Sequence, residues 1–70
     1  MTREIKLSNN YTAKIIFGNH DKNLRLIEDN FSVEIIARGN IIKLIGEEKE
    51  VDIVFQLFEE LDKIANKKEG

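Results

Sequence analysis

Residues 31–46, FSVEIIARGNIIKLIG, decide the fold of this chain. Gly39 and Asn40 separate two runs rich in isoleucine, and a two-residue loop that begins with glycine is typical of a β-hairpin with a type II′ turn. In that turn the first loop residue needs a positive φ, which glycine adopts without steric cost. The pattern predicts antiparallel strands on either side, with Arg38 facing Ile41 across the loop.

The register of this hairpin can be checked against the chemistry of its two faces. A two-residue loop puts Ile35 opposite Leu44 and Glu34 opposite Ile45, so that one face is apolar and the other mixed. A slip by one residue would carry charges into the core, and the pairing is therefore strongly specified. The apolar face consists of Val33, Ile35, Ala37, Ile42 and Leu44, and the mixed face of Glu34, Ile36, Arg38, Ile41, Lys43 and Ile45.

A long amphipathic helix is predicted from about residue 47 to residue 66. Acidic residues at its start and lysines at its end complement the helix dipole. Its apolar residues form a stripe that faces the core and a second stripe beside it. Together they make an apolar surface wider than one sheet needs to cover. The first stripe consists of Val51, Val54, Phe55, Phe58, Leu61 and Ala65, and the second of Ile53, Leu57 and Ile64.

Two further elements are predicted before the hairpin. Residues 3–7 predict a strand with Ile5 and Leu7 on one side. Residues 21–30 predict a shorter helix, with Asn30 as its C-cap in the left-handed conformation.

Residues 9–17 fit a strand or a helix equally well. Apolar residues alternate there as in a strand, yet Tyr11 and Ile15 also have the i, i+4 spacing of a helix. The polar residues 8–10 could cap such a helix. Periodicity alone leaves both readings open.

Length and composition restrict the class of protein. Seventy residues make one domain, and the absence of cysteine excludes disulfides and thiolate metal sites. The start of the chain lacks the apolar segment of a secretion signal, and no run approaches the about 18 apolar residues of a membrane span. We therefore expect a cytoplasmic domain. A net charge of −2 argues against strong non-specific binding of nucleic acid.

Two blocks of the sequence resemble a known family. FGNHDKNLRLIE at residues 17–28 and VEIIARGN at residues 33–40, followed by Gly46, look like the N-terminal region of PhoH-like proteins, which are bacterial P-loop ATPases often linked to RNA metabolism. The resemblance covers about residues 8–68. It implies that residues 1–70 form a single N-terminal domain of a longer protein whose ATPase domain follows. The chain has no Walker A sequence, so ATP and Mg²⁺ are expected only in that ATPase domain, and this chain is expected to have no cofactor and no enzymatic activity.

The same region resembles a KH domain. The KH pattern G-x-x-G-x-x-I-x-x-I falls with identical spacing on Gly18, Asp21, Leu24 and Ile27. The resemblance implies an α+β fold of KH-like type I order, β-α-α-β-β-α, with a three-stranded antiparallel sheet and helices packed on one face. It also favours a helix for residues 9–17, because the glycine loop of a KH domain joins two helices.

A KH loop grips the backbone of single-stranded RNA, so the resemblance implies RNA or a ribonucleoprotein as partner, with no membrane contact and no DNA specificity. The implied nucleic-acid-binding residues are Gly18, Asn19, His20, Lys22, Arg25 and Arg38. Asp21 departs from the pattern, since it replaces the second glycine and puts a carboxylate where a phosphate would lie. We interpret Asp21 chiefly as a helix N-cap, and Arg38 first as a residue of the turn.

Clustered apolar residues outside the predicted core support an alternative function. Such clusters often mark interfaces, and they would suit a protein-interaction or oligomerisation module that docks on the ATPase domain or a neighbouring subunit. The interface residues would be Ile36, Ile41, Ile45, Ile53, Leu57 and Ile64. Alternatively, the first strand covers part of them. We expect no catalytic residue and no metal site, because His20 is alone and adjacent glutamates on a helix do not face each other.

Overall fold

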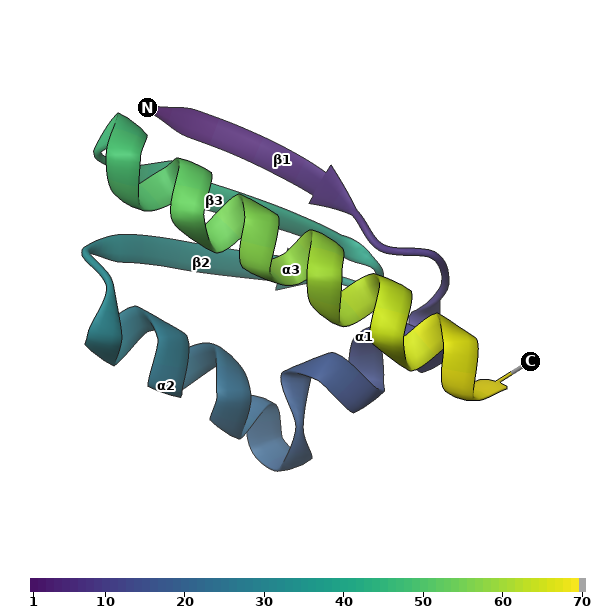
Figure 1. Cartoon of the computed structure of the whole chain (residues 1–70). Coiled ribbons are helices and arrows are strands. Elements are labelled where there is room, and N and C mark those ends of the chain that lie inside the picture. The colour runs from purple at the N-terminus through teal and green to yellow at the C-terminus, as the bar shows by residue number, and fades with distance from the viewer. Residues whose placement is uncertain (70) are drawn as a thin grey trace.

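Three antiparallel strands form one sheet in the computed structural model, which describes residues 1–69 and the side chains of residues 1–66. The strands are β1 (Thr2–Lys6), β2 (Val33–Arg38) and β3 (Ile41–Gly46). β3 lies in the middle of the sheet, between β1 and β2 (Figure 1). The predicted register is confirmed at every position, since Arg38 faces Ile41 and Ile35 faces Leu44. Gly39 has a φ of 59°, as the turn requires.

The helices all lie on one side of this sheet (Figure 1). They are α1 (Asn10–Phe17), α2 (Lys22–Asn30) and α3 (Glu48–Glu69), with a 3₁₀ turn, η1 (Asn19–Asp21), between the first two. Along the chain the order is β1, α1, η1, α2, β2, β3, α3. The structure is therefore a small α+β domain of two layers.

The core lies between the sheet and α3. Ile42 and Leu44 of β3 are fully buried, and they meet Val54 and Phe58 on the helix stripe that the sequence predicts. Phe55 of the same stripe is only half-buried, because it lies at the margin of the layer. α3 begins one residue later than predicted and ends beyond residue 66.

Polar contacts attach α3 to the N-terminal segment at both ends. Arg3 of β1 bonds to the Asp52 carboxylate at 2.8 Å, and its guanidinium lies 3.8 Å from the centre of the Phe55 ring. Further along the helix, the Asp62 carboxylate accepts hydrogen bonds from the backbone N–H and the hydroxyl of Ser8, at 3.1 and 2.7 Å. The connection from β1 to α1 is thus fixed against α3.

The ambiguous segment is the helix α1. Asn9 caps it, because its side-chain oxygen accepts a hydrogen bond from the Thr12 N–H at 2.7 Å. The residues that it buries are spaced for a helix, and Ile15, which a strand would have placed in the core, is 50% exposed. The buried residues are Thr12, Ala13, Ile16 and Phe17.

The predicted cap at the end of α2 is wrong. Asn30 is the last helical residue and does not have a positive φ, and the chain continues in an extended conformation at Phe31, where φ is −131°. The Asn30 side chain instead donates to the Leu26 carbonyl at 2.7 Å. It satisfies a terminal carbonyl directly, so no left-handed turn is needed there.

The outer edge of β2 is partly occupied by α2. Glu28 accepts a hydrogen bond from the Ile35 backbone N–H at 2.7 Å, on the side of the strand that β3 leaves unpaired. Of the helices within residues 1–69, none is long and apolar enough to cross a membrane.

Candidate nucleic-acid interface

Gly18 ends α1 and begins the loop that the sequence identifies as the candidate site. Its N–H donates to the Lys14 carbonyl at 3.1 Å, and its φ is 80°. A Cβ at this position would lie 2.7 Å from Nδ2 of Asn23, whose side chain donates to the Ile16 carbonyl at 2.9 Å. The glycine is therefore required by the packing of the loop against α2 as well as by its φ.

The loop then makes one 3₁₀ turn with two left-handed residues in succession. His20 has φ and ψ of 55° and 35°, and Asp21 has 56° and 28°. The Asp21 N–H donates to the Gly18 carbonyl at 3.2 Å, which closes the turn. Left-handed conformations cost free energy for residues with a side chain, although Asp tolerates them better than most.

The prediction that Asp21 caps α2 is wrong. Asp21 precedes the helix and is exposed, but its side chain makes no capping hydrogen bond. An N-cap residue normally has an extended backbone, which directs its side chain toward the free N–H groups of the first turn. The left-handed backbone of Asp21 directs the carboxylate elsewhere, so the charge remains exposed beside the loop.

Basic side chains gather around this loop. One surface hollow is lined by loop residues together with Lys14, and an adjoining one by Asn19 and His20 together with Lys22 and Arg25. Within residues 1–66, none of these basic side chains forms an ion pair, and acidic Asp29 lines the second hollow. Sequence reasoning missed Lys14. Lys14 lies four residues before Gly18, which brings it next to the loop only if the segment between them is a helix.

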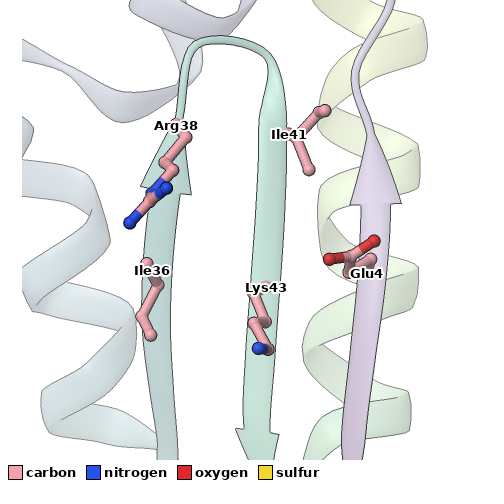
Figure 2. A pocket seen from close by; sticks show the side chains of 5 residues that line it. All are labelled: Glu4, Ile36, Arg38, Ile41 and Lys43. Atoms are coloured by element: carbon pink, nitrogen blue, oxygen red, sulfur yellow. The ribbon is translucent and has the colours of Figure 1, made fainter.

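The structure separates Arg38 from the other predicted RNA-binding residues. Arg38 lies at the end of β2 on the sheet face away from the helices, where it lines a shallow hollow of about 280 Å³ with Ile36, Lys43 and Glu4 (Figure 2). No loop residue lines this hollow. We call this sheet face the outer face; it consists of Thr2, Glu4, Lys6, Glu34, Ile36, Arg38, Ile41, Lys43 and Ile45.

The predicted interface residues fall on two opposite sides of the molecule. Ile36, Ile41 and Ile45 belong to the outer face, and β1 does not cover them, because it lies beside β3 in the same sheet. Leu57 and Ile64 line a groove of about 340 Å³ between the helices. We call it the helical groove. Its main apolar residues are Ile15, Leu26, Ile27, Leu57, Leu61 and Ile64.

The helical groove also contains residues that the sequence did not single out. Ile15 of α1 and Leu26 of α2 are 50% and 59% exposed, and both line it. The two residues lie on different helices, so no local sequence pattern connects them. Ile53 of α3 is exposed but does not line the groove.

The candidate surfaces present exposed cations and apolar side chains. Within residues 1–66, no group of three or more His, Asp or Glu residues is close enough to hold a metal ion. The loop offers glycine, backbone and exposed cations, and the groove offers apolar side chains. No protein-family model, curated protein or solved structure matches this chain, so the candidate sites rest on its own geometry and chemistry.

Proposed function

We propose that this chain is a KH-like accessory domain of a PhoH-like ATPase, that it associates with RNA or a ribonucleoprotein, and that it has no catalytic activity of its own. The observation that carries the proposal is the loop from Gly18 to Asp21. It joins two helices, within a chain ordered β-α-α-β-β-α, and three exposed cations surround it.

The loop would contact the sugar–phosphate backbone of a single strand. Gly18 has no side chain to keep phosphates at a distance. Lys14, Lys22 and Arg25 can each neutralise a phosphate without breaking an ion pair to any residue from 1 to 66. The exposed Asp21 carboxylate opposes this attraction. We therefore expect weak binding that decreases steeply with salt.

A salt series of single-stranded RNA binding tests the proposal. Lys22→Glu and Arg25→Glu should each weaken binding at low salt, and each should reduce the slope of log K against log[salt] by about 0.7 for every phosphate that the variant no longer neutralises. Lys49→Glu is the matched control, because it makes the same charge change on an exposed position of α3.

Two results would remove the nucleic-acid function. One is no binding by the wild-type chain even at low salt. The other is binding that Lys22→Glu and Arg25→Glu reduce no more than Lys49→Glu does, since affinity would then reflect net charge alone.

A second candidate function is a protein-interaction module, which the helical groove favours. It gathers exposed apolar residues from three helices, and such clusters are typical of interfaces. The partner would be the chain's own ATPase domain or a neighbouring subunit. Leu57→Lys should then lower affinity for the rest of the protein, measured by titration calorimetry. A monomer whose Leu57→Lys and Ile41→Lys variants bind as the wild type does would refute it.

A further inference from the structure

The outer face carries a regular grid of side chains. β1, β3 and β2 lie side by side, and each contributes every second residue to this face (Figure 2). The cross-strand register therefore sets three rows. From the hairpin end they are Lys6–Ile41–Arg38, then Glu4–Lys43–Ile36, then Thr2–Ile45–Glu34.

The charge on this grid changes sign from one end of the strands to the other. The row at the hairpin end has two cations, Lys6 and Arg38, and the row at the opposite end has the acidic Glu34. Isoleucines accompany these charges, and Ile41 of the hairpin-end row and Ile36 of the middle row are 44% and 37% exposed. Within residues 1–66, no charged side chain of the outer face forms an ion pair. Its charges are all available to a partner.

The charges select one way for two copies to meet. The two grids come into line when a two-fold axis in the plane of the face runs along the strands or across them. Along the strands, it would place Lys6 opposite Arg38, which repel. Across the strands, it places Arg38 opposite Glu34 and Ile41 opposite Ile45. We propose that the outer face binds a second copy of this chain in this second orientation.

In this dimer the two end rows of the face meet each other, and their residues find suitable partners. The Arg38–Glu34 pair occurs twice, once on each side of the axis, and a guanidinium can bind a carboxylate in bidentate fashion. Ile36 meets its own counterpart on the axis. Lys43 and Glu4 of the middle row also face their own counterparts, which are like charges. Because the two lie on adjacent strands, each lysine can turn from the opposing lysine toward the glutamate of the other copy.

The size of the face indicates a weak dimer. Three strands spaced by about 4.8 Å, each about 20 Å long, give a footprint on the order of 300 Å², well below the roughly 800 Å² per partner of a stable complex. Dimerisation should therefore appear only at high protein concentration. The proposal gives the second candidate function a defined partner and does not depend on RNA binding.

Sedimentation equilibrium of the purified chain without RNA, at concentrations up to about millimolar, tests the proposal. Arg38→Glu and Glu34→Arg should each raise the dimer dissociation constant by at least about tenfold, because two attractive pairs become repulsive. An equimolar mixture of the two variants should dimerise again, since both pairs are then of opposite sign. A chain that carries both Arg38→Glu and Glu34→Arg should dimerise without any partner variant. Lys49→Glu and Glu59→Arg, at exposed positions of α3, are matched controls.

Several outcomes would overturn the proposal. A wild-type chain that stays monomeric at the highest concentration would do so, as would single variants whose mixture dimerises no better than either alone. If Arg38→Glu strengthened the dimer, the two-fold axis would run along the strands, where Arg38 faces Lys6. Loss of the dimer in Leu26→Lys, with no effect of Arg38→Glu, would assign it to the helical groove. Because Arg38 and Glu34 are exposed and their side chains make no hydrogen bond to any residue from 1 to 66, their variants should keep the wild-type circular dichroism spectrum.

Discussion

His20 and Asp21 adopt left-handed backbone conformations in succession, at the loop where RNA binding is proposed. The two residues differ in the charge of their side chains. His20 has a short aromatic side chain, whereas Asp21 adds a negative charge at a position where the KH pattern has glycine. The strain and the charge at Asp21 can be separated, because asparagine removes only the charge and glycine removes both.

Asp21→Asn should increase RNA affinity at low salt and leave stability nearly unchanged, since asparagine also tolerates a left-handed φ. Asp21→Gly should increase affinity similarly and raise the free energy of unfolding by up to about 1 kcal/mol, because glycine has no steric penalty at a φ of 56°. Urea denaturation and fluorescence titration with labelled RNA measure the two effects. Equal affinities for wild type and both variants would show that the Asp21 charge does not face RNA.

Among the elements, α1 depends most on its cap. It has only eight residues, and the Asn9 side chain satisfies one of its free N–H groups. Asn9→Ala should lower the free energy of unfolding by about 1 kcal/mol, as seen from urea denaturation. Asn10→Ala, one residue further and inside the helix, is the matched control and should be neutral or slightly stabilising. A similar loss in both variants would contradict the cap.

The elements differ in how far the sequence could predict them. The hairpin was predictable in full, because a two-residue loop and alternating residues determine its register. α1 was not predictable from its own periodicity, which fits two structures, although the resemblance to a KH domain favoured the helix that the structure has. The N-cap rule placed Asp21 correctly before α2 but predicted a capping hydrogen bond that its side chain does not make, because the rule assumes an extended backbone that this loop does not have.

The candidate sites show the same division. Residues 18–25 are close in sequence, so the loop could be identified from its own pattern. Lys14 and the helical groove were missed, because they are assembled from separate helices. Arg38 was grouped with the loop through a resemblance, whereas the structure places it on the outer face.

At the scale of the whole molecule, a single small core carries the stability. Phe58 is fully buried in it, and a domain of this size seldom has more than about 3–5 kcal/mol in total. Phe58→Ala should cost about 3–5 kcal/mol and leave the chain largely unfolded at 25 °C, measured by circular dichroism and amide hydrogen exchange. Ile53→Ala, at a position that is 49% exposed, should change stability little. A cooperative unfolding transition retained by Phe58→Ala would contradict this account of the core.

The hydrogen bond from the Ile35 N–H to Glu28 has a consequence for how the chain behaves when crowded. An edge strand with free N–H and C=O groups is a template on which foreign strands can add and aggregates can grow. A carboxylate from α2 already occupies one donor of this edge, so an incoming strand would have to displace it and leave a charge without its partner. The opposite edge, β1, is a short strand of five residues with charged side chains. Growth of a fibril from either edge is thereby opposed, while the outer face remains free for a partner that stacks on the sheet.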